Sequence, residues 1–185
     1  MASEIKANKI SPATGTAFTI GDSGDTFTVP SGATLAFASG AAISNAGTAS
    51  GFGKVLQVVN ATYGSQETTT STSFVATSLT ASITPSSTSS KILVLLHVNV
   101  RQNGLDHVIA TIYRDTTNLG DATWGMGQDH SHSNSQTNFG FNWLDSPSTT
   151  SSTTYTLYFR SYNGNTVYTS PNGEEGSITL IEIEA

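Results

Sequence analysis

The segment KILVLLHVNVR at residues 91–101 constrains the fold more than any other part of this 185-residue chain. Apolar residues occupy every second position in it: Ile92, Val94, Leu96, Val98 and Val100. Successive side chains of a β-strand point to opposite faces, so these five residues share one face. The segment therefore predicts a strand with one continuously buried face.

The opposite face of the same strand begins with Leu93 and Leu95 and becomes polar only at His97 and Asn99. In a two-layer sandwich this second face normally meets solvent. The two leucines therefore predict cover from a neighbouring subunit, with a loop of the same chain as the alternative.

Seven further segments have strand character, and most are separated by turn formers such as Asn103-Gly104, Asn163-Gly164 and Asn172-Gly173. They are residues 54–60, 72–83, 107–115, 137–145, 153–162, 165–170 and 177–184. Eight strands with hairpin turns and no helical period predict an all-β antiparallel sandwich, for which a jelly roll is the favoured topology.

The last of these strands, SITLIEIE, is apolar on both faces. Ile178 and Leu180 point one way, while Ile181 and Ile183 point the other. A terminal strand of this kind favours an interface. We therefore predict that Leu93, Leu95, Ile181 and Ile183 form a trimer interface.

Residues 14–47 contain a loose repeat of apolar positions eight or nine residues apart, with glycines between them. Strands this short bury little surface alone and need other copies to pack against. We therefore predict an N-terminal β-repeat arm over residues 1–50, a head domain over residues 51–185, and winding of three chains. The expected contacts of the arm are Phe18, Phe27, Leu35 and Phe37.

Composition excludes several classes of function. The net charge of -6, without a basic cluster, argues against binding nucleic acid. The chain has no cysteine for a disulfide or a Cys-based zinc site, and no run of 18 apolar residues that would insert into a membrane. No cofactor is predicted.

The segment GDSGDTFTVPSG at residues 21–32 offers two carboxylates, Asp22 and Asp25, among glycines. Calcium sites use six to eight oxygen ligands, and no glutamate follows here. Turns at Asp22-Ser23-Gly24 and Pro30-Ser31-Gly32 are the favoured interpretation.

Several phrases of the sequence resemble a family of bacteriophage virion proteins, described as tail fibre or structural proteins of phages of cyanobacteria and marine bacteria. They are EIKANKISPATGTAFTIGDSGDTFTVPSGATL, GTASGFGKVLQVV, SSKILVLLHVNV, ATIYRDTTNLG and SITLIEIEA. The resemblance covers nearly the whole chain and carries no motif of a catalytic site.

The resemblance implies a homotrimer with a head similar to the C1q and tumour-necrosis-factor fold, attached by its N-terminal arm to major capsid or tail proteins. Such a protein would be assembled in the host cytoplasm and lie on the exterior of the virion. The chain is short for a fibre of this family, which favours a capsid decoration (cement) protein over a host-reaching fibre.

An enzyme is not predicted. Polysaccharide hydrolysis needs two carboxylates roughly 5 to 10 Å apart across a groove. Candidate carboxylates exist, but most lie at strand ends or beside Gly and Asn, where aspartate is the ordinary turn residue. They are Asp106, Asp115, Asp121, Asp129 and Asp145.

His130 and His132, within QDHSHSNSQ, form the sharpest local cluster. On an extended segment both imidazoles point to one face, and three chains around an axis would offer six of them to a metal ion. Trimeric phage fibres use H-x-H in this way, so the resemblance points to the same site. The surrounding serines and asparagine favour a solvent loop without metal.

A glycan-binding head is the rival function, in which the partner is a host surface glycan. Sugar sites combine aromatic rings with short polar side chains on loops. Trp124, within the glycine-rich TWGMGQ, is the predicted glycan contact. Trp143 is expected in the core, because it continues the alternation of Phe139 and Phe141.

Overall fold

The computed structural model describes residues 26, 28–34, 54–130 and 134–184, and the chain divides into two units, Met1–Thr48 and Ala49–Ala185. In the first unit the backbone N–H of Ala33 donates to the carbonyl of Pro30 over 3.0 Å, and Gly32 has a φ of 82°. This confirms the turn predicted at residues 30–32, since only glycine adopts that φ without strain. The predicted arm contacts Phe18, Phe27, Leu35 and Phe37 lie outside the described residues, as does the Asp22 turn.

Residues 54–130 and 134–184 contain eleven strands and no helix. The described residues therefore include no helix that is long and apolar enough to cross a membrane. The strands are β1 (Val55–Tyr63), β2 (Glu67–Thr69), β3 (Val75–Ile83), β4 (Lys91–Gln102), β5 (Val108–Arg114), β6 (Thr117–Asn118), β7 (Gly127–Asp129), β8 (Gln136–Asp145), β9 (Thr153–Ser161), β10 (Val167–Thr169) and β11 (Gly176–Ile183).

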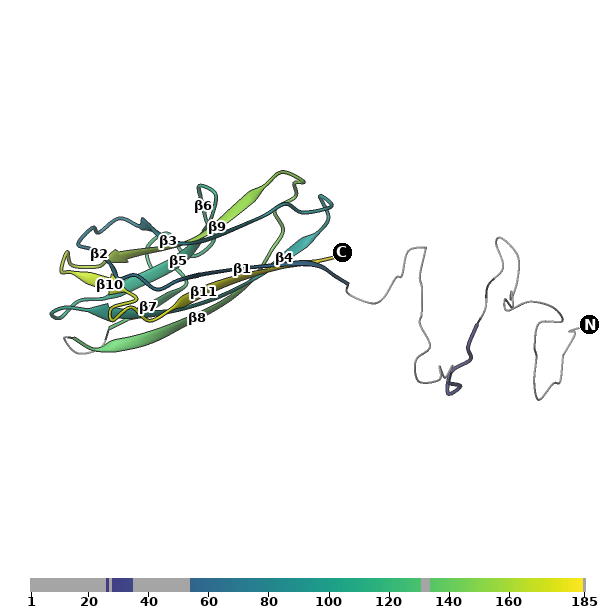
Figure 1. Cartoon of the computed structure of the whole chain (residues 1–185), viewed down its shortest axis with the longest axis horizontal. Helices are drawn as coiled ribbons and strands as arrows, with labels where there is room; N and C mark the ends of the chain where they lie inside the picture. The colour runs from purple at the N-terminus through teal and green to yellow at the C-terminus, as the bar shows by residue number, and fades with distance from the viewer. Residues whose placement is uncertain (1–25, 27, 35–53, 131–133, 185) are drawn as a thin grey trace, which may run out of the picture. The chain divides into compact units, whose positions relative to one another are not determined.

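The strands form two antiparallel sheets that face each other as the two layers of a β-sandwich (Figure 1). Sheet A has the order β1-β11-β4-β10-β2, and β8 pairs with the other edge of β4. Sheet B has the order β3-β9-β5-β6, and β7 also pairs with β5. The predicted all-β antiparallel architecture is therefore confirmed.

The hydrophobic core lies between the two sheets and contains the predicted apolar face of β4. Opposite it, sheet B contributes Tyr155, Leu157 and Phe159 of β9. The inward residues of the last strand, Ile178 and Leu180, are fully buried in the same core. Alternate residues of each long strand thus exclude water from one side of each sheet.

All eight predicted strands are present, and three short ones were missed: β2, β6 and β7. Each spans two or three residues with little apolar character, so no alternation marks them in the sequence. They form because neighbouring strands offer free edges, β10 to β2 and β5 to β6 and β7.

Sheet B has an outer face that the chain covers with its own loops. Val108, Ala110 and Ile112 of β5 join the core, so Ile109 and Thr111 point outward, yet both are fully buried. The segment 119–127 packs over them: a Cβ on Gly125 would lie 3.3 Å from the Ile109 side chain, and one on Gly120 would lie 2.6 Å from Thr111 Oγ1. Glycines therefore allow this loop to approach the sheet closely.

Candidate functional site

The outer face of sheet A carries a row of apolar side chains that crosses four neighbouring strands. Leu144 of β8 is the cross-strand partner of Leu93 of β4, Leu93 is the partner of Ile181 of β11, and Ile181 is the partner of Val58 of β1. Directly paired residues on one face lie close enough for their side chains to pack together. We call these four residues the apolar row.

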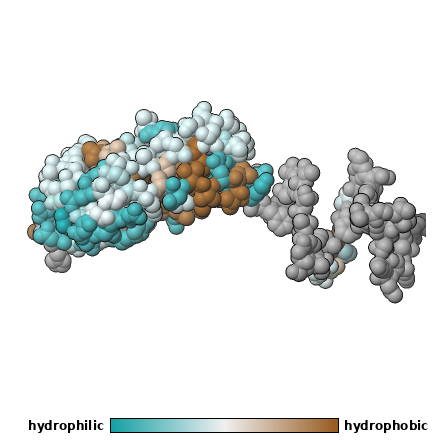
Figure 2. All heavy atoms as spheres, in the orientation of Figure 1, coloured by the Kyte–Doolittle hydropathy of each residue, from teal (hydrophilic) through white to brown (hydrophobic). Residues whose placement is uncertain are grey.

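Much of the apolar row and its surroundings is open to solvent. Val58 is 58% exposed, Leu144 is 55% exposed and the neighbouring Leu95 is 39% exposed. Figure 2 shows hydrophobic residues gathered at the end of the domain that carries the C-terminus. Ile183, one row further along β11, lies on the same face. All four head-domain residues predicted for the trimer interface thus share one face, which no loop of the described residues buries.

Lys91 and Arg101 are the outward residues near the two ends of β4. Between them, the described strands place no Lys, Arg, Asp or Glu on this face. Beyond the apolar row, amides and hydroxyls pair with each other across the strands. Asn138 donates to Asn99 Oδ1 over 2.9 Å, and Asn60 donates to Thr179 Oγ1 over 2.8 Å. Two copies could meet through this face without placing like charges together.

A second group of exposed side chains is a cluster of aromatic rings. The Trp124 ring stacks on the Tyr162 ring with 5.3 Å between the ring centroids, and the Tyr162 ring stacks on the His107 ring with 4.9 Å between the centroids. The His130 ring lies 3.9 Å from that of His107. Trp124 and Tyr162 are each 41% exposed, so this aromatic cluster presents ring surface to solvent.

Asp106 holds the cluster in place from beneath. Its fully buried carboxylate accepts hydrogen bonds from Ser161 Oγ and the His107 N–H, both at 2.6 Å, and from the N–H groups of Asn163 and Asn165. Burial raises the pKa of Asp106, but these hydrogen bonds outweigh it and lower the pKa below its usual value. Asp106 therefore organises the loop that carries Tyr162.

Trp143 does not occupy the core position expected from its alternation with Phe139 and Phe141. Its place in the register does point it inward, opposite the buried Val94, but it lies on β8 at the margin of sheet A and is 41% exposed. It lines a cavity of about 440 Å³. The other lining residues are Leu119, Gly120, Asp121, Gly125, Met126, Gly140, Phe141 and Asn142.

Of the two residues predicted to bind a metal, the structure describes one, His130. His130 is exposed and packs against His107, whereas His132 lies outside the described residues. Within the described part of the chain, no group of three or more His, Cys, Asp or Glu residues is arranged to hold a metal ion. The shared site between three chains stays a prediction.

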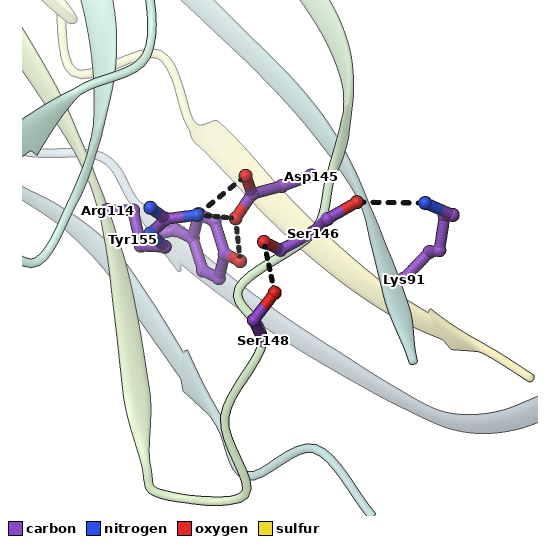
Figure 3. A network of polar contacts seen from close by, with 6 residues as sticks. All are labelled: Lys91, Arg114, Asp145, Ser146, Ser148 and Tyr155. Atoms are coloured by element: carbon purple, nitrogen blue, oxygen red, sulfur yellow. Dashed lines mark hydrogen bonds and ion pairs between the residues drawn. The ribbon is translucent and has the colours of Figure 1, made fainter. Parts of the chain in front are cut away.

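Among the carboxylates considered for catalysis, Asp145 forms hydrogen bonds that hold strands together. Asp145 accepts two hydrogen bonds from Arg114 Nη1, at 2.8 and 2.9 Å, and one from the Tyr155 hydroxyl at 2.7 Å (Figure 3). Burial and the Asp145 carboxylate raise the pKa of Tyr155 far above its usual value. This network ties β8 of sheet A to β5 and β9 of sheet B.

Two other aspartates accept hydrogen bonds from backbone N–H groups of nearby loops and strands. Asp115 accepts from the Thr154 N–H over 2.9 Å, and Asp121 Oδ1 accepts from the N–H groups of Thr123 and Trp124. These bonds lower the pKa of Asp121 below its usual value. Asp121 thereby fixes the loop that presents Trp124.

Sequence reasoning missed two charged residues that the fold buries. Glu182 is fully buried and accepts from Ser86 Oγ at 2.6 Å and Gln57 Nε2 at 2.6 Å. Burial raises its pKa, but hydrogen bonds from Ser86 and Gln57 outweigh this and lower the pKa to about 2. The sequence did contain a signal for this burial, because Glu182 alternates in step with Ile178 and Leu180 and so lies on the same inward face of the strand. The second residue is Arg160 of β9, which is only 8% exposed.

No protein-family model matches this chain, and no curated protein matches it either.

Proposed function

We propose that this protein is a non-enzymatic structural component of a bacteriophage particle, a homotrimer that serves as a capsid decoration (cement) protein or a short fibre. Residues 1–50 would anchor it to capsid or tail proteins, and the head would lie on the exterior of the virion. The sequence resemblance suggests the setting. The observation that carries the proposal is the exposed apolar row on sheet A.

The head is proposed to be a jelly roll of the kind found in C1q and tumour necrosis factor. With the short strands β2, β6, β7 and β10 set aside, sheet A has the order β1-β11-β4-β8. In sheet B, β3 pairs with β9 and β9 pairs with β5. Each sheet thus alternates early and late strands, which supports a wound jelly-roll connection.

Self-association through the apolar row would remove its side chains from water. Burial of apolar surface stabilises by about 25 cal/mol per Å². The polar half of the face, which lacks Lys, Arg, Asp and Glu, could also meet a second copy without charge repulsion, although the whole chain is acidic. An uncharged face on an acidic protein favours a second copy as the partner.

Native mass measured by light scattering at several concentrations tests the proposal. A trimer independent of concentration is expected for the wild-type chain. Leu95→Asp should leave monomers or aggregates, because each copy would bury an unpaired charge. Ala76→Asp, an exposed position on β3 of the opposite sheet, is the matched control and should remain a trimer. A monomeric wild type, or a stable Leu95→Asp trimer, would contradict the interface.

The number of copies per particle tests the place on the virion. A decoration protein should be present in hundreds of copies, and a short fibre in a handful. Quantitative mass spectrometry of purified particles, with the major capsid protein as the internal standard, would distinguish the two roles. Absence of the protein from purified particles would contradict both.

A glycan-binding head is the second candidate function, and the exposure of Trp124 favours it. An exposed aromatic ring beside polar loops is a common platform for a sugar. Host polysaccharide should quench tryptophan fluorescence in the wild type and in Trp143→Phe, but not in Trp124→Phe. Equal quenching in the wild type and in both variants would remove Trp124 from the site.

A further inference from the structure

A second cavity lies on the outer side of sheet B, separate from the apolar row. It has a volume of about 390 Å³ and is formed by the segment before β3, the loop after β6 and one side chain of β9. The lining residues are Thr72, Ser73, Phe74, Ala122, Thr123 and Arg160. Three of the six carry hydroxyl groups, and the only ionisable one is Arg160.

Arg160 is the buried part of this cavity. One guanidinium nitrogen donates to the Thr72 carbonyl over 2.9 Å, and the other donates to the Thr123 carbonyl, so the side chain ties both loops to the sheet. Its Nε–H is buried and has no hydrogen-bond partner among the described residues. Among the described residues, the Arg160 guanidinium lies over the rings of Phe74 and Tyr162, 5.4 and 5.9 Å from their centroids.

The charge of Arg160 lacks an acidic partner in the described part of the chain, in contrast to Arg114, which Asp145 neutralises. A buried cation is normally paired with an anion, because removal of a charge from water is costly. Carbonyl groups solvate the guanidinium in part but leave its positive charge in place. The six lining residues therefore carry one positive charge, and the exposed rim residues Thr72, Ser73 and Thr123 give access from solvent.

The rim can supply further donors. The hydroxyl groups of Thr72, Ser73 and Thr123 make no hydrogen bonds with other described residues. Hydroxyls can rotate to donate to an oxyanion beside a guanidinium. Since Arg160 is the one cation among the described residues that line the cavity, a singly charged carboxylate fits it better than a doubly charged phosphate.

We propose that this cavity binds a carboxylate group, with Arg160 supplying the charge and the hydroxyls of Ser73 and Thr123 supplying donors. Thr123 directly precedes Trp124, whose exposed ring stacks on Tyr162. A carboxylate carried by an acidic sugar would therefore have an aromatic surface beside it. The site does not depend on assembly through the apolar row.

The arginine side chains provide a direct measurement. The chain has three arginines, Arg101, Arg114 and Arg160, so a nitrogen-15 spectrum of the full-length protein gives three Nε–Hε signals. Sodium acetate, sodium glucuronate and methyl glucoside should be titrated at constant ionic strength, with chloride as the balancing anion. The two carboxylates should shift the Arg160 signal saturably, with a Kd on the order of 1 mM, while the neutral glucoside should leave it unchanged.

The outcomes separate the sources of the carboxylate. Tighter binding of glucuronate than of acetate would assign the site to an acidic sugar, and equal binding would assign it to a small free carboxylate. Absence of a saturable shift with both anions would overturn the proposal. A shift shared by Arg101 and Arg114 would also overturn it, since it would report a general effect of salt.

Variants provide the second test. Arg160→Gln should abolish binding, but it also removes contacts that hold two loops. Ser73→Ala leaves those contacts intact and should weaken acetate binding about tenfold through loss of one donor to the anion. Ser82→Ala, an exposed serine on the same outer face but outside the cavity, is the control and should bind as the wild type does. Unchanged binding in Ser73→Ala would contradict the assigned donor set.

Discussion

The outer faces of the two sheets both carry apolar side chains, but only one of these faces is covered by the chain's own loops. In both β4 of sheet A and β5 of sheet B, apolar residues point outward as well as inward. The outward Ile109 of β5 is fully buried beneath the chain's own loop, whereas the outward Leu95 of β4 is 39% exposed. One sheet is therefore closed within the described chain, and the other leaves its apolar row open.

The difference arises from the path of the chain after each strand. After β5 the chain returns over its own sheet in segment 119–127, where glycines permit close approach, and Arg160 fastens that loop and the segment before β3 to β9. Sheet A has no such cover within the described residues. A strand with two apolar faces thus indicates that cover is needed, and the loops decide whether a partner must supply it.

Loss of the carboxylate that neutralises Arg114 should have one of the two largest effects on stability. Asp145→Asn keeps the shape of the side chain but leaves the Arg114 guanidinium without a carboxylate partner. Among the described residues, Arg160 is in this situation in the wild type. Breaking a buried pair costs about 3–5 kcal/mol, and we expect the lower end, about 3 kcal/mol, because the Arg114 side chain is 25% exposed. Urea unfolding checks this value. A loss below about 1 kcal/mol would mean that the pair contributes no more than an exposed one.

The same truncation on the two outer faces should then have unequal effects. Ile109→Ala removes a fully buried side chain and should cost about 2–5 kcal/mol in free energy of unfolding. Leu95→Ala should cost less than about 1 kcal/mol in the dissociated chain, which is reached only far below the concentrations used for light scattering. At concentrations where copies associate, its cost should rise, because association stabilises the folded state by mass action.

Unfolding measured over a hundredfold range of concentration would separate these cases. A concentration-dependent cost for Leu95→Ala, with a constant cost for Ile109→Ala, is the expected pattern. If both costs are constant and Leu95→Ala is as damaging as Ile109→Ala, sheet A is covered by its own chain.

The fold could be predicted from sequence because long strands repeat their signal. The five alternating apolar residues of β4, and Ile178 and Leu180 of β11, lie in the core as expected. The turn at Pro30 was predictable from local chemistry alone. Strands β2, β6 and β7 were not, since their pairing depends on edges that only the folded sheet creates.

The candidate sites show the limit of pattern reasoning. Alternation predicted the direction of Trp143 correctly but not its exposure, because β8 lies at the margin of sheet A, where an inward side chain can still meet solvent. Nothing in the local sequence around Arg160 shows that two loops distant in the chain would bury it. Burial of a charge depends on tertiary contacts, which no short motif encodes.

A pair of glycine substitutions should sharpen the contrast between covered and open faces. Gly125 has a φ of 59°, and a Cβ there would clash with the Ala110 carbonyl oxygen. Gly125→Ala should therefore cost about 1–3 kcal/mol and expose the outer face of β5. Gly140→Ala on β8 meets no described atom within 4 Å and should be neutral or stabilise the strand.

Hydrogen exchange of the β5 amides checks the cause of that loss. Faster exchange in Gly125→Ala, with no change in Gly140→Ala, is expected if the loop is the cover of sheet B. Destabilisation without faster exchange in β5 would show that the loop is strained yet still in place.

The last expected effect concerns acid, at the C-terminal end of β11, which is paired with both β1 and β4. Glu182 has a pKa of about 2 in the folded protein, below its usual value near 4.5. Its contribution to stability is complete above about pH 4.5, because the carboxylate is then ionised in both states. Between pH 4.5 and 2 the unfolded chain takes up a proton that the folded chain excludes, so stability falls.

Glu182→Gln should remove this part of the pH dependence. The variant should melt a few degrees lower than the wild type at pH 6, since its amide cannot accept from both Ser86 and Gln57 as the carboxylate does. The difference should shrink as the pH approaches 2. Glu184→Gln removes an exposed carboxylate of the same strand end and should retain the wild-type profile between pH 4.5 and 2. If the two variants have parallel profiles, the hydrogen bonds to Glu182 do not depend on its charge, and the end of β11 is held by packing and backbone pairing alone.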